Sequence, residues 1–411
     1  MQELHRFKKI SLPREFLACQ GRGERMFFGL NDEEKMLRKS VRDMFKNKNT
    51  IEHVRSFMED QTISQDMQKL LSDQGLLGII DLDGSGEDGK GIVNAILVAQ
   101  EAGRHLLTYP LLETMVGVSA LKTCSNHSSL VNEIENGKKS LTIAWVNIDA
   151  KARKTDHGYS LDGTLREVPF AKDADVILAN VRVLGKGRTP DEEETLVVIN
   201  PKSTNLVIRD ANSIDLTYPL YDISLLNYHL DESAIVKGVG MGRGKYLMDQ
   251  MRKLGALLLS AELVGCAERA LYDTVEYTKQ RTQFGKVIGS FQAMKHMAAD
   301  MYLKVESGKA AVEYAAWALD SDNEEADLAI SIAKSYTSNA GIQVCGDAIQ
   351  MHGGIGFTWE NDMHLFFKRA RRSAAVLGDS YFHHENIAKV AIDEFEDRPV
   401  ARKNAVKLVE V

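Results

Sequence analysis

The spacing of apolar residues changes twice along this chain, and this limits the folds that the chain can adopt. Residues 28–137 show helical spacing, with a good helix start at Asn31. From Ser140 the pattern becomes that of short strands separated by turn signals. Long helical patterns then return, in runs such as residues 257–277 and 293–319. The sequence therefore predicts an α+β multidomain protein in which two helical parts flank a small sheet or barrel.

This change of pattern divides the chain into four parts. We expect an N-terminal helical domain at residues 28–137, a middle β-domain at 138–232 and a C-terminal helical domain at 233–411. The last part contains helices long enough to pack as a bundle. Residues 1–27 are basic, but no apolar run of a secretory signal follows them. We therefore expect them to be a disordered N-terminal extension.

Composition excludes several classes of protein. Apolar residues make up 44% and charged residues 27%, which is normal for a soluble globular chain. The formal net charge of -7 argues against nucleic acid as the main partner. No apolar run approaches the length of a membrane span. The 4 cysteines form no CxxC pair and lack metal-ligand spacing, so we expect a reduced, cytoplasmic protein without a metal site.

Two short stretches carry residues suited to ligand binding. Residues 281–291, Arg-Thr-Gln-Phe-Gly-Lys-Val-Ile-Gly-Ser-Phe, set a cation, an amide and an aromatic ring at a break between two helical patterns. Residues 350–360, Gln-Met-His-Gly-Gly-Ile-Gly-Phe-Thr-Trp-Glu, place bare glycine amides where an anion could approach them. Taken separately, the first is equally compatible with an ordinary interhelical turn, and the second with a plain glycine turn.

Together, the two stretches closely resemble the two C-terminal signatures of the acyl-CoA dehydrogenase family. The domain order is also similar to that of the family, and the resemblance covers nearly everything from residue 28 onward. It implies an N-terminal helical domain, a middle β-domain and a C-terminal four-helix bundle. It also implies FAD bound non-covalently at subunit interfaces, in a dimer that usually assembles into a tetramer.

The resemblance further implies which residues bind the cofactor. Residues of the first signature match those that hold the adenine and pyrophosphate end of FAD bound mainly by the adjacent subunit. Residues of the second match those that meet the pyrophosphate from across the interface. The expected FAD-binding residues are Arg281, Gln283, Phe284, Gln350, Gly353 and Gly354. The physical logic agrees, because a diphosphate favours an arginine and free amides, while adenine favours an aromatic neighbour.

The expected catalytic base is missing. In the family reaction, the α,β-dehydrogenation of an acyl-CoA thioester, a glutamate takes the α-proton and the flavin takes the β-hydride from the opposite side. Most members carry that glutamate at the position of Leu377, and others at the position of Gly255. Neither residue can accept a proton. Asp379 and Glu262 are nearby acidic substitutes, but a helix cap and a buried salt bridge are their simpler roles.

The middle domain also departs from the family. Relatives usually carry a Thr-Glu-x-x-x-Gly-Ser-Asp-like loop and then a Trp-Ile-Thr or Trp-Ile-Ser element that covers the flavin ring. The corresponding segments here read Trp-Val-Asn-Ile-Asp at 145–149 and Glu-Val-Pro-Phe at 167–170. The polar contacts to the flavin ring are therefore in question, and Trp145 is compatible either with packing on a flavin or with a place in the core.

Three functions remain open. The first is an FAD-dependent acyl-CoA dehydrogenase of fatty acid or lipid metabolism, acting as the base-less subunit of a heterotetramer. A second family member would then carry the base, and an electron-transfer flavoprotein would accept the electrons. The second is a homo-oligomeric flavoenzyme with altered acyl-CoA chemistry that uses Asp379 or Glu262. The third is a non-catalytic structural subunit. The sequence does not indicate which acyl group is bound.

Overall fold

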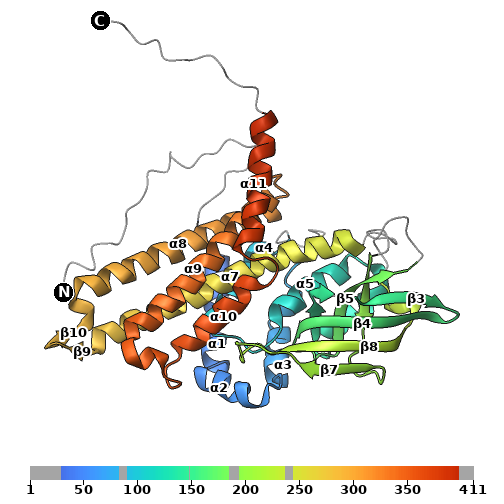
Figure 1. Ribbon diagram of the computed structural model, residues 1–411, viewed down its shortest axis with the longest axis horizontal. Helices are drawn as coiled ribbons and strands as arrows, with labels where there is room; N and C mark the ends of the chain where they lie inside the picture. Colours follow the sequence, from blue (N-terminus) through green and yellow to red (C-terminus); the bar gives the residue numbers. More distant parts are fainter. Residues whose placement is uncertain (1–28, 83–89, 148, 185–193, 237–243, 398–411) are drawn as a thin grey trace, which may run out of the picture.

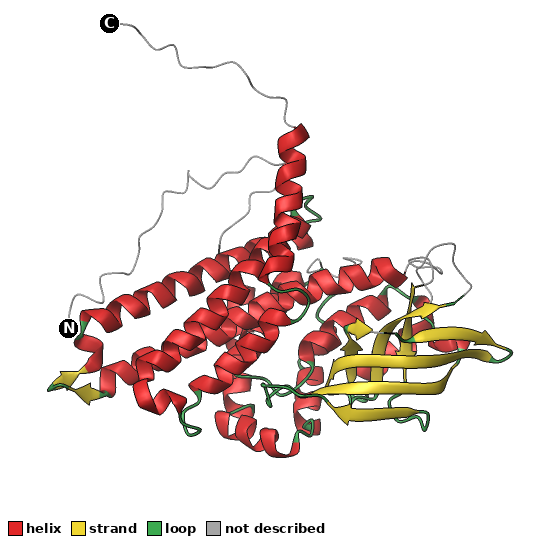
Figure 2. Ribbon diagram, viewed as in Figure 1, coloured by secondary structure: helices red, strands yellow, loops and turns green. Residues whose placement is uncertain are grey.

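The protein was analysed as a computed structural model that describes residues 29–82, 90–147, 149–184, 194–236 and 244–397 (Figure 1). The expectation for residues 1–27 lies outside these ranges. Helices make up most of the described molecule, and the large sheet lies at one end of it (Figure 2). The predicted fold class is confirmed, since helical parts precede and follow a β-domain.

The N-terminal part is helical, as predicted. Its first helix begins with a reciprocal cap, because Asn31 accepts from the Glu34 amide while the Glu34 carboxylate accepts from the Asn31 amide. The helices are α1 (Asp32–Lys48), α2 (Ile51–Asp60), α3 (Gln65–Asp73), α4 (Ile92–Arg104), α5 (Leu111–Lys122) and α6 (Ser128–Glu135).

The middle part is a mixed sheet with strand order β1-β5-β3-β4-β8-β7, with β2 paired to β4 and β6 paired to β5. Strand β5 runs parallel to β1 and β3 and antiparallel to β6. The sequence analysis missed β3, whose side chains are mostly charged and exposed, and β8. The strands are β1 (Leu141–Ala144), β2 (Val146–Asn147), β3 (Lys151–Thr155), β4 (Gly158–Pro169), β5 (Val176–Val183), β6 (Glu194–Ile199), β7 (Leu206–Asp210) and β8 (Leu220–Leu230).

The C-terminal part is a bundle of long helices. Helices α7, α8, α9 and α10 pack against one another, and α11 contacts α9 and then extends away from the bundle (Figure 1). A small hairpin joins α7 to α8. The elements are α7 (Gly244–Gln280), β9 (Thr282–Gln283), β10 (Lys286–Val287), α8 (Gln292–Asp320), α9 (Ala326–His352), α10 (Met363–Ala375) and α11 (Ser380–Asp397).

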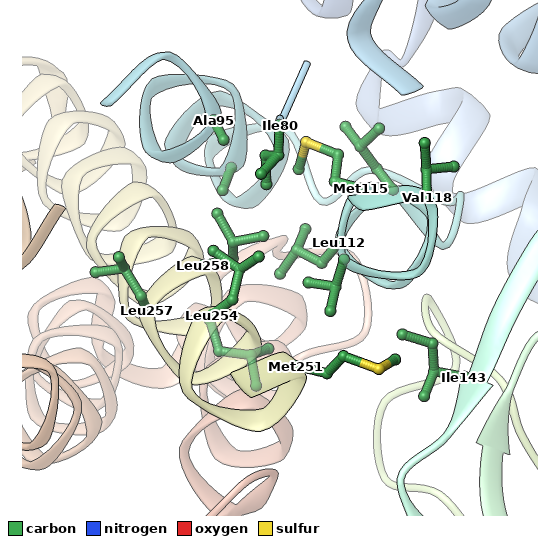
Figure 3. Close-up of a cluster of buried hydrophobic side chains, with 14 of the residues drawn as sticks. Ile80, Ala95, Leu112, Met115, Val118, Ile143, Met251, Leu254, Leu257 and Leu258 are labelled. Carbon is green, nitrogen blue, oxygen red and sulfur yellow. The ribbon is translucent and has the colours of Figure 1, made fainter. Parts of the chain in front are cut away.

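One core joins the two helical parts. Figure 3 shows Leu254 and Leu258 of α7 packed with Leu112 and Met115 of α5, and Ile143 of β1 nearby. All five side chains are at most 4% exposed. Burying such apolar surface is the main stabilising term in folding. The β-domain has a separate core of its own. Helix α7 packs against both α4 and α9 and so connects the N-terminal helices to the C-terminal bundle.

The predicted domain limits fall between elements. Helix α6 ends at Glu135 and β1 begins at Leu141, while β8 ends at Leu230 and α7 begins at Gly244. The exact division of the chain at residues 137 and 232 stays a prediction. Within the part of the chain that the structure describes, no helix is both long and apolar enough to cross a membrane.

Candidate functional site

The first signature forms the hairpin between α7 and α8. Gln283 pairs with Lys286, and the two residues between them, Phe284 and Gly285, both have positive φ values of 55° and 77°. A two-residue hairpin of this kind requires positive φ at both central positions, which glycine adopts freely and phenylalanine does not. The Phe284 ring is 88% exposed. The hairpin therefore holds a bare aromatic ring outside the bundle in a costly backbone conformation.

The second signature lies at the end of α9 and in the 3-10 turn that follows it. Gly353 has φ +65, and a Cβ atom built on Gly353 or Gly354 would meet nothing within 4 Å. The space beside both α-carbons is therefore open, while the Gly353 N–H itself donates to the Gln350 carbonyl. The preceding residue, His352, stacks on Tyr277 of α7 with 4.3 Å between ring centroids. This stacking pins the end of α9 beside the end of α7 and so brings the two signatures together.

The two signatures line one hollow of about 640 Å³. It contains all six residues predicted to bind FAD: Arg281, Gln283, Phe284, Gln350, Gly353 and Gly354. Each of the six is exposed. An exposed guanidinium, a glycine turn without side chains and an exposed aromatic ring are groups that suit a diphosphate joined to a planar base. The hollow, which we call the ADP hollow, therefore fits that part of FAD.

A second cavity, of about 970 Å³, lies where β4 and β8 meet α7, α9 and the α10–α11 junction. We call it the acyl cavity. Its lining includes Trp145 and Leu377, and the two expected base positions adjoin it side by side. A Cβ atom on Gly255 would lie 2.6 Å from Leu377 Cδ1 and 3.2 Å from a ring carbon of Trp145. The Leu377 side chain thus fills the space above Gly255, and neither position offers a carboxylate.

The two acidic substitutes have structural partners. Asp379 is exposed and its Oδ1 accepts from the Phe382 amide at 2.9 Å, so it caps α11. Glu262 is 1% exposed. Its Oε1 lies 3.1 Å from Arg369 Nη1, and its Oε2 accepts from Ser373 Oγ at 2.6 Å. These are the cap and the buried salt bridge that the sequence analysis gave as the simpler roles.

Glu262 belongs to a buried polar network behind the acyl cavity. Arg369 is fully buried and bonds Asp215 at 2.7 Å and Thr217 Oγ1 at 2.7 Å as well as Glu262. A guanidinium between two carboxylates gives each charge the partner that burial requires. Sequence reasoning missed this network, although two arginines three positions apart on α10, just before Leu377, were a visible signal.

A buried lysine holds the turn at Leu377. Lys334 is 0% exposed and donates to the carbonyls of Ser373, Ala374 and Gly378 at 2.9, 3.0 and 3.2 Å. Burial, and to a smaller extent the charge of Arg372, lower the pKa of Lys334 to about 7. These bonds satisfy carbonyls that the end of α10 leaves without helical partners. Lys334 therefore positions the turn, and it was a further residue that sequence reasoning missed.

His383 supports the same turn from α11. Its Nε2 donates to the Leu377 carbonyl at 3.1 Å, and its Nδ1 lies 3.4 Å from Ser331 Oγ. Burial lowers the pKa of His383, which favours the neutral imidazole. Although His383 lines the acyl cavity, both of its ring nitrogens are engaged. It acts as a brace for the turn at Leu377 rather than as a free base.

The β-domain wall of the acyl cavity offers few donors to a flavin ring. The Glu167 amide already bonds Asp222 Oδ1 at 3.1 Å, and Pro169 has no N–H. Trp145 is 7% exposed and its Nε1 donates to Glu113 Oε1 at 3.4 Å. It therefore belongs to the core and to the cavity wall at once. The ADP hollow fits its part of FAD, whereas the wall at residues 167–169 does not present the polar contacts expected for the ring.

Comparisons with known proteins agree with this architecture. Residues 31–128 match the acyl-CoA dehydrogenase N-terminal domain, and residues 242–392 match the acyl-CoA dehydrogenase C-terminal domain. Acyl-CoA dehydrogenase IpdE2 of Mycolicibacterium smegmatis is 30% identical over 352 residues, which cover 85% of this chain and 96% of that protein. The two matched domains thus precede and follow the β-domain in the chain.

Two solved structures show the same fold. The ChsE4-ChsE5 complex from Mycobacterium tuberculosis superposes with a TM-score of 0.79 at 23% identity, over 90% of this chain and 99% of that one. PigA with FAD and proline gives a TM-score of 0.79 at 22% identity, over 89% and 99%. The fold is thus that of the acyl-CoA dehydrogenases. With the matched domains, it establishes that the chain belongs to the acyl-CoA dehydrogenase family, whose members are flavoprotein oxidoreductases of lipid metabolism.

Proposed function

We propose that this chain is the base-less subunit of a heteromeric FAD-dependent acyl-CoA dehydrogenase. The observation that carries the proposal is the contrast between its two hollows. All six expected FAD ligands line the ADP hollow, whereas Leu377 and Gly255 fill both base positions beside the acyl cavity. A chain that kept only the first set of residues is suited to serve a flavin whose proton acceptor belongs to another subunit.

The positions of the hollows support this division. The β9–β10 hairpin lies at the end of the bundle far from the large sheet, whereas the acyl cavity adjoins the sheet (Figure 1). The ADP hollow of one chain is therefore turned toward a neighbouring subunit rather than toward its own cavity. Two of the similar proteins support the same view by their names alone, since ChsE4-ChsE5 and the Tcur3481-Tcur3483 steroid enzyme are described as pairs.

In the proposed complex, each of these residues and each subunit has a defined role in FAD binding or in the reaction. Arg281 and the amide of Gly354 hold the diphosphate, Gly353 lets the backbone approach it, and Phe284 lies against the adenine. When bound, FAD supplies the hydride acceptor for the α,β-dehydrogenation of an acyl-CoA thioester. The partner subunit supplies the glutamate that takes the α-proton, and an electron-transfer flavoprotein accepts the electrons. The complex is a heterotetramer built from two such pairs.

The test is the flavin content of the chain alone and in complex with a family member that carries glutamate at either base position. We expect the complex to be yellow and to bleach when an acyl-CoA from a panel of chain lengths is added without oxygen. We expect the isolated chain not to bleach with any of them. A flavin in the isolated chain that one thioester bleaches would overturn the proposal, as would a complex without flavin.

Variants sharpen this test. Arg281→Met in the complex removes charge-assisted bonds to the diphosphate and should weaken FAD binding by roughly 10- to 100-fold. The matched control is Lys279→Met, since Lys279 is exposed on the same segment and does not line the hollow. Leu377→Glu should leave the isolated chain inactive, because the wall at residues 167–169 still lacks its donors. If Arg281→Met and Lys279→Met lose the same amount of flavin, the role assigned to Arg281 is wrong.

A further inference from the structure

Helix α11 presents apolar side chains on the face opposite its contact with α9. The helix contacts α9 and then extends away from the bundle (Figure 1). Its inner face is held, since His383 Nδ1 lies 3.4 Å from Ser331 Oγ of α9. On the outer face, the Tyr381 and Ile392 side chains are 78% and 57% exposed. Because a helix of this length gains most of its stability from packing an apolar face, we expect another helix to cover this one.

The outer face has the residue spacing of a seam between packed helices. Four exposed residues follow one another at intervals of four, three and four positions: Tyr381, Glu385, Ala388 and Ile392. At about 3.6 residues per turn, this spacing places all four in one stripe, on the side of α11 opposite His383. We call it the outer stripe. The same alternation of three and four positions forms the seam between two packed helices, and a small alanine near its middle lets a second helix approach closely.

The outer stripe is complementary to itself. In an antiparallel pair related by a twofold axis, Tyr381 of one copy meets Ile392 of the other, and Glu385 meets Ala388. The same register sets Glu385 beside Lys389 of the second copy, one position past Ala388. Both charged side chains are exposed. The twofold axis repeats each contact, so a second copy matches both the apolar and the charged positions by symmetry, whereas an unrelated helix would have to match each of them separately.

We propose that two copies of this chain bind each other through the outer stripe of α11 in an antiparallel pair. The inference rests on the heterotetramer proposed above, which contains two copies of the chain, and adds the contact between them. Helix α11 starts beside the acyl cavity, whereas the ADP hollow lies at the end of the bundle far from the sheet (Figure 1). One chain can therefore hold the base-bearing subunit and its second copy at the same time. A single helix pair belongs to the small interfaces, below about 1,200 Å² in total, so we expect weak association of the chain alone.

The test is self-association of the full-length chain without its partner, followed by sedimentation velocity from about 1 to 100 μM. We expect the chain to associate across this range. Ile392→Asp places a charge in the apolar seam and should raise the dissociation constant at least about 10-fold. Leu226→Asp is the matched control, since Leu226 is 59% exposed on β8 of the sheet, and it should leave the association unchanged. A parent that stays monomeric at the highest concentration would overturn the inference, and so would equal dissociation constants for the two variants.

An exchange of charges identifies the partner as a second copy. Glu385→Lys alone and Lys389→Glu alone set like charges against each other and should each weaken association by about 3- to 10-fold. The double variant restores opposite charges between two copies, so its association should return to that of the parent. If the double variant stays as weak as the single variants, the inference is wrong. Circular dichroism checks that each variant is folded, and the exchange decides the question if Ile392→Asp does not fold. Flavin content tests the pairing with the base-bearing subunit separately, so the two failures are distinguishable.

Discussion

The ADP hollow and the acyl cavity differ in how their residues are held. The ADP hollow is a surface feature, in which exposed groups from two short segments meet because His352 stacks on Tyr277. The acyl cavity is backed by a buried network of charges, whose members come from distant parts of the chain. The first can bind a ligand without disturbing the fold. Changes behind the second alter the fold itself.

The same contrast explains how a base can be lost while the fold persists. Position 377 faces a cavity and its turn is held by Lys334 and His383 through backbone carbonyls. These bonds do not depend on the side chain at 377. A leucine there keeps the turn and fills the space above Gly255. The site for proton removal is therefore separable from the scaffold around it.

We expect the largest effect when the buried network of charges behind the acyl cavity loses its central cation. Arg369→Met leaves the Asp215 and Glu262 carboxylates buried without their cation. It should lower the free energy of unfolding by about 3–5 kcal/mol. Urea unfolding followed by circular dichroism measures this change. Arg371→Met, on the exposed face of the same helix, should stay within about 0.5 kcal/mol of the parent. A loss in Arg369→Met as small as in the control would show that the network does not stabilise the fold.

The next effect is a pH dependence that arises from Lys334. Its pKa is about 7 in the folded protein and 10.5 when unfolded, so between these values the unfolded state binds more protons. Stability should therefore rise as the pH rises through this window, by up to about 1.4 kcal/mol per pH unit, and should be lost as the pH falls toward 7. Below 7 this contribution is constant.

Lys334→Met should flatten that slope, whatever constant change in stability the lost bonds to the α10 carbonyls also cause. The measurement is urea unfolding at several pH values between 7 and 10, with the variant subtracted from the parent. Lys279→Met is the control, because Lys279 is exposed and should leave the slope intact. Parallel curves for the parent and Lys334→Met would mean that the lysine stays charged in the folded protein.

The two regions also differ in how well the sequence predicts them. The residues that line the ADP hollow were expected because each signature is a short run of the chain that resembles a family signature: Gly285 permits the hairpin, and Gly353 and Gly354 are neighbours. The buried network was not, because Asp215 lies 154 positions from Arg369 and no local pattern pairs them. Strand β3 was missed for a related reason, since its charged residues lie on an exposed strand whose pairing with β4 and β5 is set by the fold.

Lys334 shows where more could have been inferred. Lys334 is the only lysine or arginine in α9, most of whose residues are apolar or small, and this predicts a buried, bonded lysine, although it does not identify the carbonyls. The base positions could be counted from the signatures, but their contact could not. That Gly255 and Leu377 share one space follows only from the packing of α7 against the α10–α11 junction.

We expect the smallest effect from a change in the ADP hollow, at Gly354. A Cβ atom on Gly354 would meet nothing within 4 Å, and its backbone lies outside the left-handed region. Gly354→Ala should therefore leave the melting temperature of the isolated chain unchanged. In the complex, the added methyl group points into the ADP hollow and should weaken FAD binding by about 10-fold, since it keeps the diphosphate from the amide. Flavin released on dilution measures the affinity. An alanine variant that binds FAD like the parent would show that the diphosphate does not approach this turn, whereas a lower melting temperature would mean that the glycine serves the fold. The FAD affinity and the melting temperature of this one variant therefore show whether Gly354 serves ligand binding or the stability of the fold.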